Sequence, residues 1–471
     1  MRVLLVAQLL KARNFQPLGL EYLSAHLKRA GHQVAAADAS FHDKVISAVD
    51  ELRPDIIGYY ACTGLHRDLI RLNDKLKRRF EFFAAFGGPH ATFFPEMIKL
   101  PGIDGVCRGE GEQAIVDLAN ALEDRRDYCN IPNWWFSVGG RIVKNEVRPL
   151  VRNLDELGAP DWSLTDAMPY CRDFPVKIFM ASHGCPHSCA FCYSPAYRLL
   201  YRGQKARRTR DPLKVVDEIE LCREGSSLAF VYLFDDTFGI DPAWVSDFCR
   251  AYKKKIALPF YVNLRADLIT ENIVRDLAWA GLAFAGIGLE SGCETIRNEV
   301  LNKGVSDVQL KRAAAFMRAN NTVFSTFNML GIPGTTLDQD IETWRMNLRL
   351  RPNFAEALMF QPYPRTKLGD KAKKEGLFSG NPDDVPPNFK GQSVLNQPNS
   401  KQRLRLLYLF PIIVAYPPPP KILRGLLRLP LTPLYRLASR LYEGAVKIFK
   451  IYRISLPPRT LIRLAWHYLR Y

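Results

Sequence analysis

The sequence has no long hydrophobic run, and it has few cysteines for its length. No segment reaches the roughly eighteen consecutive apolar residues that a membrane-spanning helix needs. Ten cysteines in 471 residues are too few for a disulfide scaffold. The N-terminal stretch 1–15 has a short apolar run without a small-residue cleavage site, so we interpret it as a buried strand rather than a signal peptide. These absences predict a cytoplasmic protein in a reducing compartment.

Acidic residues are scarce in the last part of the chain. Residues 401–471 contain 14 Lys and Arg residues and a single acid, Glu443, which gives this segment a net charge of +13 out of a total of +17. The first 400 residues carry only the remaining +4. We therefore predict that a basic partner surface belongs to the tail and not to the body of the protein.

Short apolar segments alternate with segments of helical spacing over the first 125 residues. Examples are "RVLLVA" at 2–7 and "DIIGYYA" at 55–61, and Gly31 between them marks a helix end. Such alternation is typical of an α/β domain whose parallel sheet is covered on both faces. We predict a doubly wound, Rossmann-like domain at 1–130, followed by an irregular linker at 131–175.

A second alternating series runs from residue 176 to about residue 365. It contains about six strand–helix units, beginning with "VKIFMAS" at 176–182, and Asp211-Pro212 marks a helix start within it. The pattern predicts a partial (β/α)6 barrel at 176–380, whose active site would lie at the carboxyl ends of its strands. Residues 381–471 would then form a basic helical tail.

Glycine-rich and polar loops follow three strands of the N-terminal domain, at 62–66, 87–91 and 109–112. Ligands of open parallel sheets bind beyond the carboxyl ends of the strands. Small residues there let a large planar or phosphate-bearing ligand approach the backbone, although each loop could also be a simple turn. The candidate ligand contacts in these loops are Thr63, Gly64, Gly87, Gly88, Pro89, His90, Gly109, Glu110, Gly111 and Glu112.

Three cysteines stand within eight residues directly after the first barrel strand: Cys185, Cys189 and Cys192. Three thiolates can hold three irons of a 4Fe–4S cluster and leave the fourth iron open. A structural zinc site needs a fourth ligand, which only His183 or His187 could supply nearby. The other seven cysteines are scattered, and we expect them to be reduced core residues: Cys62, Cys107, Cys129, Cys171, Cys222, Cys249 and Cys293.

The segment "CPHSCAFC" (185–192) resembles the CxxxCxxC loop of radical S-adenosylmethionine (SAM) enzymes. The resemblance continues along the barrel and covers roughly residues 1–380. In the N-terminal part, "PLGLEYL", "GGPHATF" and "RGEGE" resemble the cobalamin-binding domain that precedes the barrel in one large subgroup. The matching barrel segments are "FDDTF" (234–238), "LRAD" (264–267), "GIGLESG" (286–292), "GIPGTT" (331–336) and "PYPRTKL" (362–368).

The resemblance implies a set of roles for these residues. The three cysteines would ligate the cluster, and its open iron would take the amino and carboxylate groups of SAM, which one electron cleaves to a 5′-deoxyadenosyl radical. Phe191 would lie against the adenine. Alternatively, each of the polar candidates caps a helix or forms a surface ion pair. The SAM contacts implied by the resemblance are Phe191, Asp235, Asp236, Arg265, Asp267, Glu290 and Ser291.

Three features depart from the family pattern. Thr335 stands where the family often has an acid, and Arg365 stands where it often has glycine. The N-terminal domain also lacks the Asp-x-His-x-x-Gly motif that supplies a histidine to cobalt in other cobalamin proteins. In the resembling subgroup this absence implies a cobalt without a protein histidine, and the other interpretation is a domain that has lost cobalamin.

The tail combines cations with aliphatic residues. The stretch 406–420 is apolar and then broken by prolines, and it is too short to span a bilayer. Beyond it Arg436, Arg440, Lys447 and Lys450 recur at helical spacing, with Glu443 on the same stripe. We interpret this pattern as a helix lying on an anionic membrane, on its inner face. The alternatives are a helical cap packed on the barrel and, less in keeping with the aliphatic residues, an RNA-binding segment.

Together these features predict a cobalamin-dependent radical SAM enzyme, a methyltransferase acting on an unactivated carbon of a hydrophobic, lipid-like substrate. It would draw electrons from a flavodoxin or ferredoxin. One alternative is a radical cyclase, oxidase or carbon–carbon coupling enzyme with a vestigial or non-methylating cobalamin domain. Another is a tRNA methylthiotransferase, but Cys62, Cys107 and Cys129 do not stand at the strand ends where that family has further cluster ligands. A non-enzymatic cobalamin or iron–sulfur sensor would not need a complete barrel.

Overall fold

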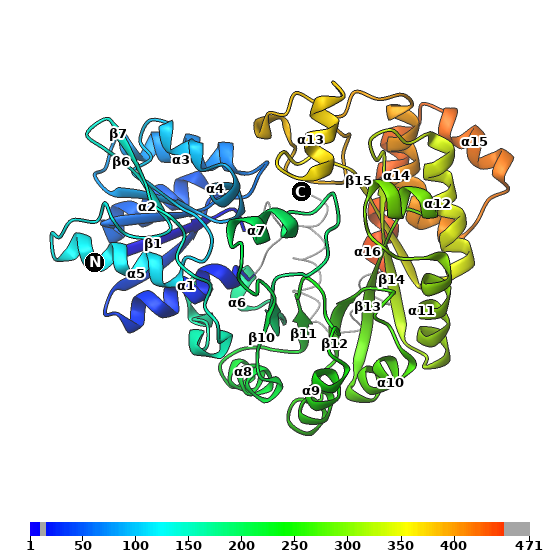
Figure 1. Cartoon of the computed structure of the whole chain (residues 1–471), viewed down its shortest axis with the longest axis horizontal. Helices are drawn as coiled ribbons and strands as arrows, with labels where there is room; N and C mark the ends of the chain where they lie inside the picture. The colour runs from blue at the N-terminus through cyan, green and yellow to red at the C-terminus, as the bar shows by residue number, and fades with distance from the viewer. Residues whose placement is uncertain (10–15, 447–471) are drawn as a thin grey trace. The chain divides into compact units, whose positions relative to one another are not determined.

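The computed structural model describes residues 1–9 and 16–446, which form two compact units (Figure 1). The first unit contains Met1–Phe174 and two later segments, Ala196–Ala206 and Pro382–Pro387. The second unit contains Pro175–Pro195, Arg207–Asn381 and, of the described residues after that, 388–446. Both units have the α/β architecture expected from the sequence.

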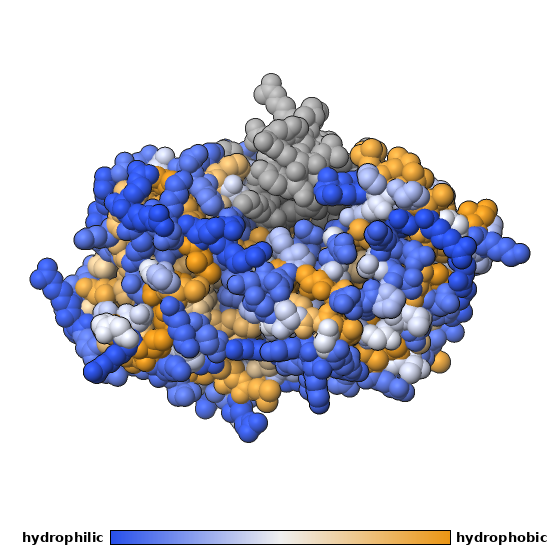
Figure 2. Space-filling model, turned by 90° about the horizontal axis from the view of Figure 1, so that it is seen from above, coloured by the Kyte–Doolittle hydropathy of each residue, from blue (hydrophilic) through white to orange (hydrophobic). Residues whose placement is uncertain are grey.

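Among the described residues, no helix is both long enough and apolar enough to cross a membrane. The face of the molecule in Figure 2 is mostly hydrophilic, with hydrophobic residues in several groups, one of which lies at the upper right of the view.

The first unit is built around a seven-stranded sheet with the order β2-β1-β3-β4-β5-β6-β7. β1 to β5 are parallel, which confirms the predicted doubly wound sheet. The strands are β1 (Arg2–Ala7), β2 (Gln33–Asp38), β3 (Ile56–Tyr60), β4 (Phe83–Gly87), β5 (Gly105–Cys107), β6 (Trp134–Val138) and β7 (Arg141–Lys144). The helices are α1 (Leu18–Arg29), α2 (His42–Leu52), α3 (His66–Lys77), α4 (Pro89–Phe93), α5 (Glu112–Glu123) and α6 (Pro169–Arg172).

The expectation of an irregular segment throughout 131–175 is wrong for the hairpin of β6 and β7. These two strands extend the sheet in antiparallel pairing with β5 and with each other. The hairpin turns at Gly139-Gly140, both of which have positive φ. Trp134 and Phe136, on one face of β6, are buried in the core of the unit. A Gly-Gly pair between short apolar runs is a hairpin signal that the sequence interpretation overlooked.

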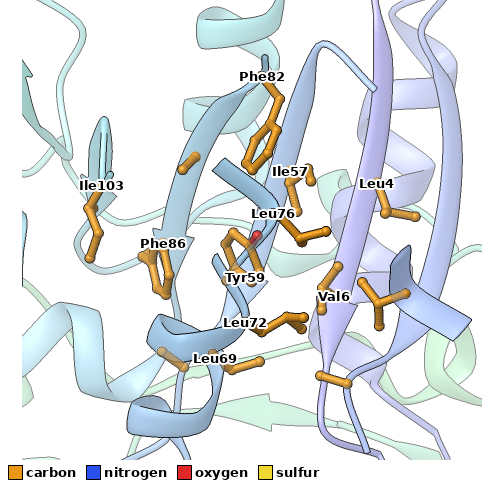
Figure 3. Close-up of a cluster of buried hydrophobic side chains, with 14 of the residues drawn as sticks. Leu4, Val6, Ile57, Tyr59, Leu69, Leu72, Leu76, Phe82, Phe86 and Ile103 are labelled. Carbon is orange, nitrogen blue, oxygen red and sulfur yellow. The ribbon is translucent and has the colours of Figure 1, made fainter. Parts of the chain in front are cut away.

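Alternating side chains of the central strands fill two cores, one on each face of the sheet. Leu4, Val6, Ile57 and Tyr59 pack with the apolar face of α3 in one of them (Figure 3). The neighbouring positions, such as Val3 and Leu5, point to the other face, where α1 and α5 cover them. The loops that follow the parallel strands are therefore held at one edge by a sheet that is buried on both sides.

The second unit contains a six-stranded sheet with the order β15-β14-β13-β12-β11-β8, in which all neighbouring strands are parallel. This confirms the predicted six-stranded partial barrel. Its strands are β8 (Val176–Phe179), β11 (Phe230–Leu233), β12 (Phe260–Leu264), β13 (Leu282–Glu290), β14 (Val323–Leu330) and β15 (Phe354–Met359), and a two-residue ladder joins β9 (Ser182–His183) to β10 (Arg208–Thr209).

Helices cover the outer face of this sheet, and their ends follow the sequence signals. The Asp211 side chain accepts hydrogen bonds from the first turn of α8, and Gly281 ends α10 with a φ of 110°. The helices of this unit up to residue 381 are α8 (Pro212–Gly225), α9 (Pro242–Lys255), α10 (Glu271–Ala280), α11 (Asp307–Ala319), α12 (Leu337–Leu350) and α13 (Lys367–Lys374). The short helix α7 (Ser194–Leu200) follows the cysteines, and most of it belongs to the first unit.

The described part of the tail forms three helices: α14 (Ser400–Ala415), α15 (Pro420–Arg428) and α16 (Thr432–Val446). α14 is buried and packs against β15 and α12, where the indole of Trp344 donates a hydrogen bond to the Ile413 carbonyl. The tail therefore begins as part of the barrel unit. Lys447 and Lys450 lie outside the described residues.

The placement of Glu443 on an exposed basic stripe is wrong. Glu443 is buried, and its carboxylate forms an ion pair with Lys390 at 3.0 Å. The helical spacing was interpreted correctly for the described part of the helix. A charged residue stays inside when an oppositely charged partner compensates its charge, and the sequence pattern does not reveal such a partner.

Candidate functional site

The loop from Cys185 to Cys192, here called the cysteine loop, follows the first strand of the second unit. Its three cysteines are partly buried and form no disulfide among the described residues. The backbone of Ala190 anchors the loop at its centre: its N–H donates to the Leu301 carbonyl, and its carbonyl accepts from the N–H of Leu368, both at 2.8 Å. Segments following β13 and β15 therefore hold the loop in place.

Each of the three thiols has a different polar neighbour. Cys185 Sγ lies 3.4 Å from the Thr237 hydroxyl, Cys192 Sγ lies 3.3 Å from the Ser194 hydroxyl, and an Arg265 Nη1 lies 3.7 Å from Cys189 Sγ. Burial raises the pKa of the Cys189 thiol, and the charges of Lys303 and Arg265 act in the opposite direction. Two cations beside a buried sulfur favour a bound thiolate.

The donor set fits a cluster better than a single ion. Among residues 1–9 and 16–446, no three His, Cys, Asp or Glu side chains are arranged to hold one metal ion. In a 4Fe–4S cluster each thiolate binds its own iron, so three sulfurs spread along one loop suit it.

Two ion pairs flank the cysteine loop. Arg265 and Asp267 form a two-pronged pair, with Nε–Oδ1 and Nη2–Oδ2 distances of 3.0 and 3.1 Å, and Arg265 also donates to the Lys303 carbonyl. The Lys303 ammonium lies 2.8 Å from Glu290 Oε1. A side chain at Gly288 would collide with both members of that pair, because its Cβ would lie within 2.6 Å of each. Glycine at 288 thus makes room for the Glu290–Lys303 pair.

Asp235 is an internal anchor rather than an open carboxylate. It accepts hydrogen bonds from the Ser182 hydroxyl at 2.5 Å and from the Ala181 N–H at 3.2 Å, which tie β11 to the start of the cysteine loop. Burial raises its pKa to about 6. Arg207 completes this network by donating to Ser182 Oγ and to the Thr237 carbonyl.

The remaining candidates for SAM contacts lie near these groups but differ in their exposure and in the hydrogen bonds that they already make. Asp236 follows Asp235 with an exposed side chain, and Phe191 is partly buried within the cysteine loop. Ser291 is buried, its hydroxyl accepts from the Cys293 N–H, and its carbonyl accepts from Arg297. Ser291 therefore shapes the loop after β13.

A buried ion pair holds the loop 331–336 after β14. Arg403 of α14 contacts Asp340 through Nε at 2.7 Å and also donates to the Thr335 carbonyl. Asp340 accepts from the Gly331 N–H at 3.1 Å. Thr335, one of the departures from the family pattern, thus accepts a hydrogen bond from a residue of the tail.

Arg365, the other residue that departs from the family pattern, adopts a φ of 67°, in the left-handed region that favours glycine.

Sequence inspection missed Lys303, Arg207 and Arg403. Each is a basic residue in a polar stretch of sequence, where a solvated surface position is the ordinary expectation. All three become part of the site only through partners that are distant in the chain. The local sequence contains no signal that separates them from surface cations.

The three loops 62–66, 87–91 and 109–112, here called the three-loop edge, come together in the first unit as predicted. They follow the adjacent strands β3, β4 and β5. The Thr63 hydroxyl lies 3.1 Å from His90 Nδ1, and the rings of His66 and His90 stack with centroids 3.6 Å apart. The Gly109 N–H donates to Thr92 Oγ1 at 3.1 Å, which links the third loop to the second.

The other candidates of the three-loop edge begin helices or support the backbone. Gly88, with a φ of 91°, precedes Pro89 at the first position of α4. Gly111 precedes Glu112 at the start of α5. Glu110 accepts a hydrogen bond from the Val151 N–H through its carboxylate. Gly87 ends β4 and leaves its surroundings nearly open, since the nearest atom to an added Cβ would lie 3.9 Å away.

Two segments from later in the chain complete this edge within the first unit. Tyr201 places its hydroxyl against Gly109 and accepts from the Glu110 N–H. Asp383 pairs with His66 at 2.7 Å, and Pro386 lies against Gly64. Sequence analysis missed both segments, because their pairing with the first domain depends on the tertiary fold.

The three-loop edge fits a cobalamin that is bound through backbone and small residues. Its glycines allow close approach of a ligand to the main chain. His66 and His90 are engaged with each other and with Asp383 and Thr63. This arrangement agrees with a cobalt that takes no histidine ligand from the protein.

Comparison with known protein families gives two matches, one in each unit. Residues 12–119 match the model of the B12 binding domain, and residues 179–345 match the model of the radical SAM superfamily. The first match contains the three-loop edge, and the second contains the cysteine loop and the ion pairs around it.

Curated relatives match most of the chain at low identity. An uncharacterised methyltransferase of Pyrococcus horikoshii is 28% identical over 77% of this chain and 79% of its own. An anaerobic magnesium-protoporphyrin IX monomethyl ester cyclase of Rubrivivax gelatinosus is 28% identical over 77% and 68%. A hopanoid C-3 methylase of Methylococcus capsulatus is 26% identical over 75% and 68%.

Solved structures share the fold. The radical SAM methyltransferase TsrM of Kitasatospora setae, with cobalamin and a [4Fe-4S] cluster bound, superposes with a TM-score of 0.67 at 16% identity, over 79% of this chain and 75% of that one. The cobalamin-dependent radical enzyme OxsB, with aqua-cobalamin and SAM bound, gives a TM-score of 0.69 at 16% identity, over 100% and 75%.

Proposed function

Because the chain belongs to the cobalamin-dependent radical SAM enzymes, we propose that it methylates an unactivated carbon of a hydrophobic, lipid-like substrate. It is a radical SAM enzyme, and its cofactors are a 4Fe–4S cluster, SAM and cobalamin, as in other enzymes with this pair of domains. The observation that carries the proposal is the presence of both family domains in one chain whose curated relatives include methyltransferases.

Different residues around the cysteine loop would bind the cluster, orient SAM and support the loops. Cys185, Cys189 and Cys192 would hold the cluster, which when bound supplies the electron that cleaves SAM. The Arg265–Asp267 and Lys303–Glu290 pairs lie beside it and would orient the polar groups of SAM, together with the exposed carboxylate of Asp236. Phe191 would cover the adenine, whereas Asp235 and Ser291 would act by holding the loops in place.

The inner face of the barrel sheet supports a hydrophobic substrate. Phe260 packs against α9, so the alternate residue Tyr261 points to the opposite, inner face. There Tyr261 contacts Tyr232 and Phe284, with ring centroids 4.4 and 4.3 Å apart. Phe234, at the end of β11 beside Asp235, has 52% of its surface exposed. Tyr261 and Phe284 are themselves buried and form the floor of this cluster, so an apolar molecule would lie against Tyr232 and the exposed ring of Phe234, near the carboxyl ends of the strands.

Two partners follow from the proposed chemistry. Radical SAM enzymes need a reductant, and a flavodoxin or ferredoxin would supply the electron. A lipid-like substrate requires access to a membrane, so we place the enzyme at the cytoplasmic face of an anionic membrane. The basic composition of the tail supports this location.

Radical cyclisation is the second candidate reaction. It is favoured by the similarity to anaerobic magnesium-protoporphyrin IX monomethyl ester cyclases, one of which matches 77% of this chain. A large planar substrate would also suit the aromatic inner face. The two reactions differ in their products, because methylation adds one CH₂ to the substrate and cyclisation removes hydrogen.

The test is anaerobic reconstitution with iron, sulfide, cobalamin, SAM and a reductant, followed by incubation with a membrane lipid extract. We expect 5′-deoxyadenosine and a lipid product heavier by one CH₂. Methyl-labelled SAM should transfer its label to that product. Formation of 5′-deoxyadenosine without any labelled lipid, together with turnover of magnesium-protoporphyrin monomethyl ester, would replace methylation by cyclisation.

A substitution on the aromatic surface sharpens this test. Phe234→Ala should lower labelled product roughly tenfold by weakening contact with an apolar substrate, while uncoupled cleavage of SAM continues. Trp279→Ala is the matched control, because Trp279 is equally exposed on α10, on the outer face of the barrel. Equal effects of the two substitutions would contradict the placement of the substrate.

A further inference from the structure

Helix α16 turns a largely aliphatic face outward. Leu434, Leu437 and Leu441 lie on one side of the helix, and their exposed fractions are 57%, 52% and 57%. The side that faces the protein contains Tyr435, Ser439, Glu443 and Val446, which are buried. This distribution is the reverse of the usual one, in which the leucines of a surface helix face the core.

Polar contacts hold α16 in this orientation. Lys390 lies between two carboxylates, with its ammonium 3.0 Å from Glu443 and 3.2 Å from Glu356 of β15. The Tyr435 hydroxyl donates to the Leu426 carbonyl of α15. Rotating the helix to bury its leucines would separate Glu443 from Lys390. The outward leucines are therefore a consequence of the anchored inner face.

The outward leucines are part of a larger apolar surface. Ile422 of α15 is 54% exposed, and Leu429 and Leu431, which connect the two helices, are 46% and 40% exposed. Residues Ile422, Leu429, Leu431, Leu434, Leu437 and Leu441 are here called the tail surface. In Figure 2, hydrophobic residues gather at the upper right, on the side of the view where Figure 1 draws α15. A surface of this kind marks an interaction site.

Positive charges predominate around the tail surface. The exposed acid Asp338 of α12 is paired there with Arg424 of α15, at 2.8 Å. Lys421, Arg428 and Arg436 are exposed beside it. The single acid of residues 416–446 is Glu443, which is buried and paired with Lys390. A second copy of this chain would bring cations against cations, so self-association is unfavourable here. An anionic membrane offers both an apolar layer for the leucines and negative headgroups for the cations.

We propose that the tail surface docks this protein on an anionic membrane, with the leucines of α16 entering the acyl boundary and the flanking cations contacting lipid phosphates. The sequence that follows α16 contains further Lys and Arg residues and no acid, which suits the same partner. The proposed function supplies only the reason for membrane docking, which is access to a lipid-like substrate. Docking itself requires neither SAM cleavage nor methyl transfer, so the two can fail separately.

The test is flotation of the full-length, cofactor-loaded protein with phosphatidylglycerol-containing vesicles and with pure phosphatidylcholine vesicles. We expect binding to the anionic vesicles that weakens as salt is raised. Leu434→Gln/Leu437→Gln/Leu441→Gln should reduce binding by more than about tenfold. The matched control is Leu213→Gln/Leu221→Gln on α8, where both leucines are equally exposed and flotation should stay unchanged.

A second variant reports docking without removing the leucine face. Leu437→Trp should show indole fluorescence that brominated phosphatidylglycerol vesicles quench, because quenching requires the side chain to reach the acyl boundary. Unchanged flotation of the triple variant, or unquenched fluorescence of the vesicle-bound Leu437→Trp variant, would overturn the proposal. A triple variant that floats normally but changes from dimer to monomer would assign the surface to a second copy instead.

Discussion

The cysteine loop and the three-loop edge both lie at the carboxyl ends of parallel strands, but side chains form the first site and the backbone forms the second. The cysteine loop is defined by side chains: three thiols, with Arg265 and Lys303 held by carboxylates. The three-loop edge is defined by backbone shape, with positive φ at Gly64, Gly88 and Gly109. At a side-chain site, the residue types alone indicate which ligand is bound. At a backbone site, the sequence indicates only where a ligand can approach, not which ligand it is.

The two kinds of site should also fail differently when one residue changes. A side-chain site loses a ligand or a charge partner outright, whereas a backbone site loses shape and so loses stability and affinity together. Four substitutions test this difference, and the first has the largest expected effect.

Cys189→Ala should abolish the cluster. The wild-type chain should carry about four irons after anaerobic reconstitution, and a cluster that loses one of its three ligands should not assemble or cleave SAM. Iron and sulfide analysis and visible absorbance measure this. Cys129→Ala, far from the cysteine loop in sequence, is the control and should retain full iron. Normal iron content and SAM cleavage in Cys189→Ala would refute the assignment of the cysteine loop.

Arg403→Met should lower the free energy of unfolding by about 3–5 kcal/mol, because it leaves the buried carboxylate of Asp340 without its partner. Replacing both residues, as Arg403→Met/Asp340→Leu, should restore much of that loss. The control is Arg424→Met, whose ion pair with Asp338 is exposed and should contribute less than about 1 kcal/mol. Denaturant unfolding distinguishes these values, and equal losses for the two arginines would contradict the argument.

Gly109→Ala should cost about 2–3 kcal/mol and weaken cobalamin binding, because a side chain there meets the Tyr201 hydroxyl and forces a residue with a Cβ to adopt positive φ. Gly140→Ala also has positive φ but open space around it, so it measures the backbone cost alone. Adding Tyr201→Phe to Gly109→Ala should recover the steric part. If that double variant gains nothing over Gly109→Ala alone, the contact with Tyr201 does not set the shape of the loop.

Asp383→Asn should have the smallest effect, below about 1 kcal/mol near neutral pH, because half of the Asp383 side chain is exposed. Burial lowers the pKa of His66, and the Asp383 carboxylate opposes that shift. The unfolded chain therefore binds the proton more tightly, and stability falls as pH drops through the ordinary histidine pKa of about 6.5. The loss should be steeper in Asp383→Asn. Parallel pH profiles in the two proteins would show that the pair does not couple in solution.

The sequence alone identified what depends on local pattern and on residue chemistry. Strand and helix alternation predicted both α/β sheets, and the cysteine spacing predicted the loop at the end of β8. The glycine loops were placed at one edge because parallel strands end on the same side of a sheet. Cap residues such as Asp211 and Gly281 also acted as predicted, since their effect spans only a few residues.

Only the tertiary structure decided which distant groups face one another. Lys303, Arg207 and Arg403 became part of the site through partners that are 13, 25 and 63 residues away, and Tyr201 and Asp383 joined the first unit from later in the chain. The direction of α16 was decided in the same way. Helical spacing placed Glu443 on one stripe with the cations, but its ion pair with the partly exposed Lys390 holds it inward and leaves the leucines outside. Periodicity specifies which residues share a face, whereas the energy of pairing a buried charge decides which face turns inward.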